Sequence, residues 1–245
     1  MEYKEIRNNT FSEGKSIVYE SSIQETFIKL MRKVYLWMTL ALLITGLTSY
    51  LTACSSTIMI LLFEHPYTVW GLLAVELIVV LILSGRIHKL SIVQATTLFV
   101  LYSIINGITL SFIFLAYEGA NIAKAFIITS GTFCSMSIYG YVTKKNLATI
   151  GKYFYMALLG LIIATIVNLF MGSSLLDMII CYAGVIIFVG LTAWDTQKIK
   201  RLLIESSQYG VNEGNMKIAL LGALSLYLDF INLFLYILRI MGKKK

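Results

Sequence analysis

Long apolar runs, separated by short polar segments, dominate this chain from about residue 34 to residue 241. A run of roughly 20 apolar residues is what an α-helix needs to cross the hydrocarbon core of a bilayer. Lipid cannot hydrogen-bond an exposed backbone, so runs of this length must be helical. The stretch 58–63 is too short to cross. The pattern therefore predicts an all-α polytopic membrane protein with seven transmembrane helices, at residues 34–53, 67–83, 91–117, 120–142, 153–171, 175–194 and 218–241.

The same pattern divides the chain into three parts. Residues 1–33 are predicted to form a polar cytoplasmic N-terminal segment, in which 24–33 make a short interfacial helix leading into the membrane. Residues 34–241 are the predicted seven-helix transmembrane domain. Residues 242–245 are a basic C-terminal tail.

Composition supports a membrane protein and excludes several other classes. Of the 245 residues, 58% are hydrophobic and only 13% are charged, about half the usual soluble fraction. The mean hydropathy is +0.80. Too few charged residues remain to give a soluble globule a polar shell, and a disordered, collagen-like or disulfide-rich chain is excluded too. The three cysteines are far apart, so neither a disulfide framework nor a metal site is predicted.

The net charge of +7 reflects topology, and no nucleic-acid partner is expected. Fifteen Lys and Arg residues fall in the N-terminal segment and in the loops after the second, fourth and sixth spans, against five on the other side. Positive residues favour the cytoplasm, which places the N-terminus there. Seven full spans leave the tail 242–245 outside, against this rule, whereas a re-entrant last segment would return it. Seven spans is the favoured interpretation.

Small residues four apart predict close helix contacts at two places. These are Gly131 with Ser135 and Gly160 with Ala164.

Ionisable side chains within the apolar runs need a reason, because each costs roughly 2.5–3.5 kcal/mol to insert. Asp229 is about eleven residues from either end of its run, roughly 16 Å, which is too deep to reach water. Its two interpretations are a functional acid and a structural carboxyl that is protonated or bonded to Asn232 or a hydroxyl. Glu76 is also at mid-depth, and function and structure are equally compatible with it.

Two further charges stand at predicted span ends. Asp195 ends the sixth span, where it can be an ordinary interfacial residue paired with Lys198. Arg86 ends the second span, where it can be a positive anchor or a partner for the acids. Simple arithmetic puts Asp195 at the boundary and Asp229 near mid-depth. The two can therefore meet only if the sixth helix is tilted or the seventh begins below the membrane.

Two acids on neighbouring helices allow three chemistries. They can bind a hard cation such as calcium, since it prefers oxygen ligands. They can share a proton, since close like charges disfavour double ionisation. They can form an intramembrane aspartyl protease, but the glycines of that motif are absent here and Pro66 is the only proline. No enzyme activity and no bound cofactor are therefore expected.

The two segments around these aspartates resemble the Bax inhibitor-1 family. They are VGLTAWDTQKIK at 189–200 and ALLGALSLYLDFINLFLYILR at 219–239. The span pattern extends the likeness to about residues 30–241, and MRKVYLWMTL at 31–40 is most like bacterial members. Many relatives have Tyr where this chain has Trp194, a change that alters packing and keeps the carboxylate.

The resemblance implies a fold with the seventh helix central, surrounded by the other six. It implies a calcium leak that responds to pH, with Asp195 and Asp229 as the sensor and gate, and as transient calcium ligands. It implies that Arg86 engages this pair in the closed state, and that Glu76, with Asp229, lines the ion path. Calcium ions, protons and the lipid bilayer are the implied partners.

The function predicted from the sequence is thus a pH-sensitive calcium leak channel, in which the two carboxylates are hydrogen-bonded to each other and held by Arg86. Two alternatives stay open. One is an interaction protein that modulates a protease or a stress or cell-death pathway through membrane protein partners. The other is a proton-coupled carrier. A bacterial plasma membrane is the expected location.

Overall fold

The computed structural model describes residues 2–64, 66–208 and 210–242, with the side chains of 21–64, 67–208 and 210–242. Every regular element in these ranges is helical. In chain order they are α1 (Glu2–Cys54), α2 (Ser56–Glu64), α3 (Pro66–Arg86), the 3-10 turn η1 (Ile87–Lys89), α4 (Ile92–Leu110), α5 (Phe112–Ala116), α6 (Gly119–Val142), α7 (Ala148–Met171), α8 (Ser174–Ser207) and α9 (Glu213–Met241).

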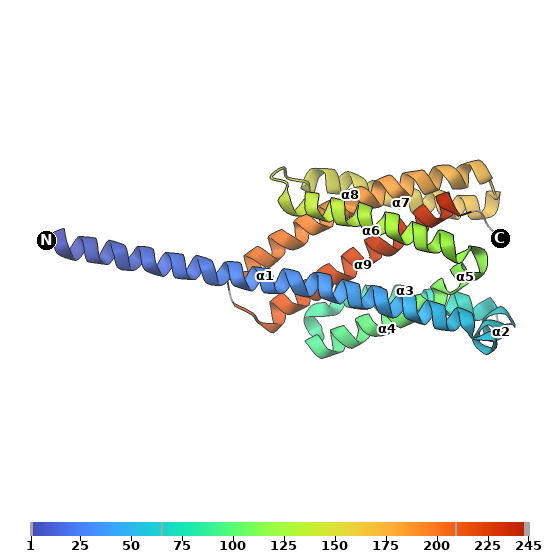
Figure 1. Ribbon diagram of the computed structural model, residues 1–245, viewed down its shortest axis with the longest axis horizontal. Helices are drawn as coiled ribbons and strands as arrows, with labels where there is room; N and C mark the ends of the chain where they lie inside the picture. Colours follow the sequence, from blue (N-terminus) through green and yellow to red (C-terminus); the bar gives the residue numbers. More distant parts are fainter. Residues whose placement is uncertain (1, 65, 209, 243–245) are drawn as a thin grey trace.

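Seven of these helical segments are long and apolar enough to cross a membrane, which confirms the predicted fold class. The helices run back and forth along one direction, and α9 ends at the opposite end of the bundle from the one where α1 projects (Figure 1). The last helix is continuous over 29 residues and is long and apolar enough for a full span, which favours seven spans over a re-entrant last segment. The lysines of the C-terminal tail, 243–245, lie outside the described residues.

The first helix differs from the prediction. The short interfacial helix expected at 24–33 is part of one unbroken helix, α1, that continues to Cys54. No proline interrupts this stretch, so nothing in the chain ends the helix at the membrane boundary. Packing also begins before residue 34, since Phe27 and Leu30 are already buried in the core.

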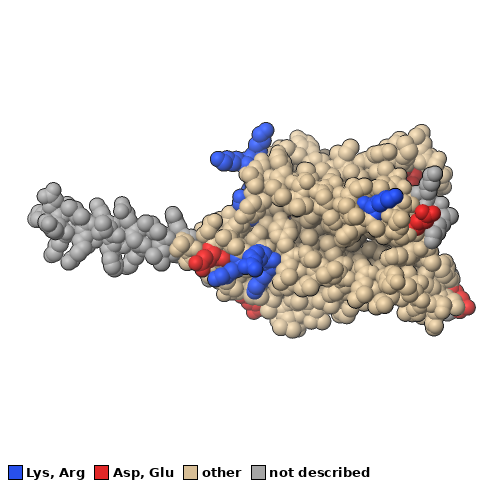
Figure 2. All heavy atoms as spheres, viewed as in Figure 1, with Lys and Arg blue, Asp and Glu red and all other residues tan. Residues whose placement is uncertain are grey.

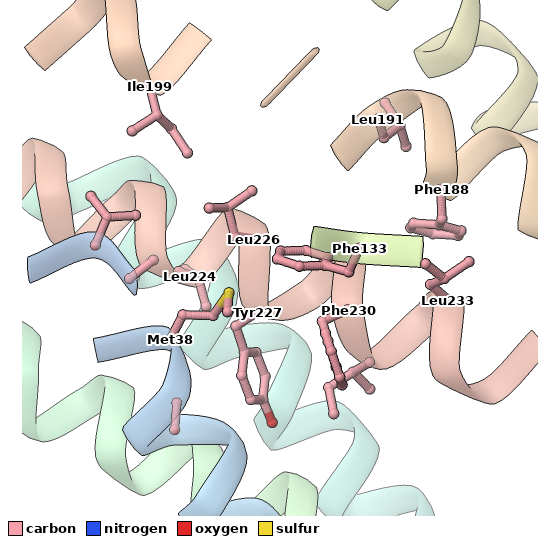
Figure 3. Close-up of a cluster of buried hydrophobic side chains, with 14 of the residues drawn as sticks. Met38, Phe133, Phe188, Leu191, Ile199, Leu224, Leu226, Tyr227, Phe230 and Leu233 are labelled. Carbon is pink, nitrogen blue, oxygen red and sulfur yellow. The ribbon is translucent and has the colours of Figure 1, made fainter. Parts of the chain in front are cut away.

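The last helix is the centre of the bundle. In its most apolar stretch 67% of residues are buried, against 6% for α7. It packs mainly against α8, α1, α6 and α4, while α3 and α7 form an outer layer on α4 and α8. Figure 3 shows its side chains among those of α1, α6 and α8. The outer helices present large apolar residues, such as Phe170 at 84% exposure, as expected for a surface that faces lipid.

A buried tyrosine ties the central helix to its neighbours. Tyr227 of α9 is fully buried, and its ring points away from Ile199 of α8 (Figure 3). Its hydroxyl donates to Asn106 Oδ1 of α4 at 3.0 Å and lies 2.7 Å from Thr45 Oγ1 of α1. Thr45 in turn donates to the carbonyl of Ser103 at 2.9 Å. A buried hydroxyl without partners is costly, so these bonds fix how α9 is rotated.

The connection between α8 and α9 is short and well capped. Gly210 has φ = 68°, a left-handed conformation that glycine adopts without strain. Asn212 and Asn215 then form a reciprocal capping box at the start of α9. Glu213 accepts a hydrogen bond from the backbone N–H of Ile92 at 2.9 Å, which joins the start of α9 to that of α4. These contacts set the register of α9 against α8.

The predicted small-residue contacts are wrong. A Cβ placed on Gly131 or Gly160 meets no atom within 4 Å, and Ser135 is exposed. The close approach lies instead at Gly140 of α6, where an added Cβ would collide with the backbone of Ala193 in α8. Small residues spaced four apart leave one face of a helix without bulky side chains, but this spacing does not show whether that face meets a neighbouring helix.

We predict that Gly140→Ala lowers the free energy of unfolding by about 1–3 kcal/mol, because the new methyl group meets backbone that cannot rotate away. Denaturant titration in detergent micelles measures this change. Gly131→Ala, on the same helix and facing open space, is the matched control. It should be neutral or stabilise by up to about 1 kcal/mol through helix propensity. Equal destabilisation by both variants would contradict the α6–α8 packing.

We also predict that Tyr227→Phe destabilises the protein by about 1–3 kcal/mol, because it leaves Asn106 Oδ1 buried without its donor. Tyr102→Phe serves as the control. Tyr102 is likewise buried, and its ring packs on Tyr227 at 5.8 Å, but its hydroxyl makes no hydrogen bond within the described part of the chain. It should change stability by less than about 0.5 kcal/mol. Similar losses in both variants, in the same titration, would show that the bonds do not matter.

Candidate functional site

Asp195 lies well inside the sixth spanning helix and not at its end. Helix α8 continues to Ser207, so about 18 Å of helix follows this residue. The side chain is 4% exposed, and its Oδ2 accepts a hydrogen bond of 2.6 Å from Ser225 Oγ of α9. The alternative partner, Lys198, is exposed, with its ammonium 4.9 Å from the centre of the Trp194 ring. It is near enough to interact electrostatically with Asp195, but it forms no ion pair with it.

The antiparallel register of α8 and α9 explains how the two aspartates meet. Asp195 is twelve residues before the end of α8, and Ser225 is twelve residues after the start of α9. At 1.5 Å per residue both lie about 18 Å from the turn, which accounts for their hydrogen bond. Asp229 is one helical turn further on, about 6 Å deeper, on the same face as Ser225. The apolar runs predict Asp195 at the membrane boundary and Asp229 near mid-depth. The two can lie close together because α8 is longer, and α9 starts earlier, than those runs indicate.

Asp229 is the least satisfied polar group of the site. Its side chain is 5% exposed, and Oδ2 is buried without a hydrogen-bond partner among the described residues. Asn232, one of the partners considered for it, donates instead to the carbonyl of Leu228 at 2.8 Å. Asp195 is near enough for the two charges to interact. Ser225 donates to one oxygen of Asp195, and the bond expected between the two carboxyl groups stays a prediction.

A tyrosine of the outer layer also approaches this site. Tyr155 of α7 is near enough to interact electrostatically with both Asp195 and Asp229. Its ring meets Trp194 edge-on, with centroids 5.2 Å apart. Trp194 therefore packs against the tyrosine that approaches the two aspartates.

Glu76 of α3 occupies a second polar region, on the other side of α9. It is 9% exposed. Thr109 Oγ1 donates to its Oε1 at 2.6 Å, and Asn106 Nδ2 donates to its Oε2 at 3.2 Å. Since Asn106 also accepts from Tyr227, a continuous hydrogen-bonded chain connects Glu76 to the central helix.

The structure does not bring Arg86 to the aspartates. Helix α3 ends at Arg86, and the next residue, Ile87, is buried and anchors the turn that follows. The Arg86 side chain is exposed and forms no ion pair within the described ranges. Helix α3 packs on α4, on the side of the bundle away from α8.

Sequence reasoning missed the neutral residues around these acids. Ser225 and Thr109 donate to Asp195 and Glu76, Tyr227 and Thr45 continue the hydrogen-bonded chain from Glu76 through Asn106, and Tyr155 approaches the two aspartates. Ser225 had a usable signal, because it is four residues before Asp229 and must share its helix face. Tyr227 lies between Ser225 and Asp229 in the sequence. Its side chain points roughly 200° around the helix axis from that of Ser225. The central helix therefore carries carboxylate chemistry toward α8 and a hydroxyl toward α1 and α4. A rotation of α9 would disturb both regions together.

Comparison with known proteins places this architecture in a family. Residues 27–245 match the family described as inhibitor of apoptosis-promoting Bax1. The chain is 44% identical over 237 residues to the inner membrane protein YbhL of Escherichia coli, covering 96% of this chain and 99% of that protein. It is 41% identical over 224 residues to an uncharacterized protein of Borreliella burgdorferi, with 91% and 96% covered. It is 38% identical over 239 residues to an uncharacterized protein of Rickettsia prowazekii, with 98% and 94% covered. The chain is an integral membrane protein that belongs to the Bax inhibitor-1 family.

Proposed function

We propose that this protein is a pH-sensitive leak pathway for calcium ions, closed by the carboxylates of Asp195 and Asp229. The observation that supports this proposal is the burial of both acids on facing helices, with no ion pair to either of them among the described side chains. Burial of two acids without a cation is expensive, and structural stability alone gives no reason to keep them.

The charge on these acids is the proposed switch. In a low-dielectric interior two negative charges repel strongly, so the site either holds a proton or takes up a cation. Each event changes the net charge between α8 and α9. The buried Oδ2 of Asp229, which has no hydrogen-bond partner among the described residues, is the atom we propose to receive the proton or the cation.

The site suits a passing ion better than a resident one. Calcium usually takes six to eight oxygen ligands, and two carboxylates with one hydroxyl fall short of that number. Within the described residues no group of three or more His, Cys, Asp and Glu side chains gathers. Asp195 and Asp229 are therefore proposed as transient ligands of a transported ion, in a protein that transports and does not catalyse.

Glu76 has a defined place in this proposal. Both of its oxygens accept hydrogen bonds in this conformation, so it must exchange them before it can hold an ion. One of those donors, Asn106, also accepts a hydrogen bond from Tyr227 of α9. A movement of α9 would therefore disturb the bonds of Glu76, and we propose it as the trigger for the exchange. Arg86 is given no role in this conformation, because it is exposed and unpaired within the described ranges.

We further propose a bacterial inner membrane, with the N-terminus in the cytoplasm. The name of the Escherichia coli relative supports the membrane, and the distribution of Lys and Arg supports the orientation.

We predict that the purified chain, reconstituted into liposomes, admits calcium at a rate that changes at least about fivefold over a pH series, which is typical of coupled sites. Asp195→Asn and Asp229→Asn should each remove most of this pH response, because the group that titrates is gone. A calcium indicator trapped inside the liposomes measures the rate. Size-exclusion chromatography before reconstitution checks that each variant is folded.

The matched control is Asp177→Asn, the same substitution on the same helix α8. Asp177 forms a half-exposed ion pair with Arg239 at the far end, a kind of pair that contributes little to stability. It should keep the wild-type response. If both site variants also keep it, the proposal fails. Saturable proton uptake that requires a co-substrate would favour the carrier alternative instead.

A further inference from the structure

An apolar groove runs between α1 and α6 on the surface of the bundle. Both helices pack on α9 and make little contact with each other. The groove has a volume of about 670 Å³, within the range of ligand sites. Phe230 of α9 lies at its floor, where its ring meets Phe133 of α6 at 5.4 Å. A second hollow of about 420 Å³ continues it, and Leu42, Phe126 and Phe230 line both.

Basic residues gather at one end of this groove. Arg32 lines the groove and also an adjoining hollow that it shares with Lys29 and Lys33. Figure 2 shows Lys and Arg side chains at the end of the helical body from which α1 projects. On the opposite wall, Lys200 lies 4.7 Å from the ring of Tyr141, which lines the groove.

Arg32 is the charge best placed to meet an anion, because Lys200 donates to the carbonyl of Tyr141 at 2.7 Å and Lys33 lies 3.9 Å from Met216 Sδ. Arg32 forms no ion pair with any described side chain. Lys29 pairs with Glu25 at 3.5 Å, but both side chains are more than 60% exposed, so the pair is weak.

The dimensions of the groove match one lipid chain. From Arg32 to Leu42 its α1 wall is roughly 15 Å long. One leaflet of a bilayer has a hydrocarbon depth of about 15 Å. Phe27 and Tyr141 stack at the basic end with ring centroids 6.3 Å apart, so a helix of a second copy, about 10–12 Å wide, cannot enter at that end.

We propose that this groove binds one anionic phospholipid molecule. Its phosphate lies at Arg32, with Lys29 and Lys33 beside it, and one acyl chain follows the groove between α1 and α6 to Phe230. The basic end attracts the headgroup, and the apolar walls take the chain. This site does not depend on whether the protein conducts ions.

The test is native mass spectrometry of the purified protein with dioleoyl phosphatidylglycerol or dioleoyl phosphatidylcholine, which share acyl chains and differ in headgroup charge. We expect one tightly retained phosphatidylglycerol and weaker retention of phosphatidylcholine. Arg32→Gln should weaken phosphatidylglycerol binding about fivefold, the contribution expected of one basic residue at a membrane surface. Arg201→Gln, a basic residue that lines a different hollow, should leave it unchanged.

A second pair of variants tests the acyl-chain part of the site. Ser130 lines the groove, whereas Ser135 faces out from the same helix, and each hydroxyl bonds to the carbonyl four residues earlier at 2.8 Å. Ser130→Trp should fill the groove and abolish tight retention of both lipids, and Ser135→Trp should not.

Three outcomes would overturn the proposal. The first is equal retention of the two lipids by the wild-type chain. The second is equal loss in a variant and its control. The third is a dimer that carries no lipid and that Ser130→Trp dissociates, since this result would assign the groove to a second copy of the chain.

Discussion

A helix enclosed by other helices can offer its polar side chains neither to water nor to headgroups, so each must find a partner on a neighbour or on the backbone of its own helix. Helix α9 is in this position, and its polar groups determine where its neighbours lie. Ser225 bonds to Asp195 of α8, and Tyr227 bonds to α4 and approaches Thr45 of α1. Asp229 is the exception, because one of its oxygens has no partner among the described residues. Packing does not account for such an exception at the centre of a bundle, and the proposed function offers a reason for it.

The arrangement of spans could be predicted from the sequence because lipid imposes a simple length rule, and the seven apolar runs met it. The ends of the helices could not, because nothing in that rule stops a helix at the membrane surface. Helix α8 continues for thirteen residues after Trp194, and α9 begins five residues before Ile218. Because of this extension, Asp195 is twelve residues from the end of its helix and faces Ser225 of α9.

Within the candidate site, charge was the readable signal. A carboxylate in an apolar run stands out because it is costly, and so Asp195, Asp229 and Glu76 could be selected from the sequence. Serine, threonine and tyrosine are common in such runs, and only their partners reveal which of them matter. Arg86 is equally conspicuous in the sequence, but the residues that it can reach depend on how α3 packs. Helix α3 packs mainly on α4, and the Arg86 side chain is exposed.

Both ends of the central helix are held by its neighbours. At its start, Asn215 is buried and Glu213 accepts the backbone N–H of Ile92, and near its end Ile237 and Leu238 are buried in the core. A rod held at both tips resists sliding along its length, whereas bowing or twisting at the middle leaves the tips in place. Any large displacement would therefore be concentrated near Asp229, and distance labels attached close to either tip would record very little of it.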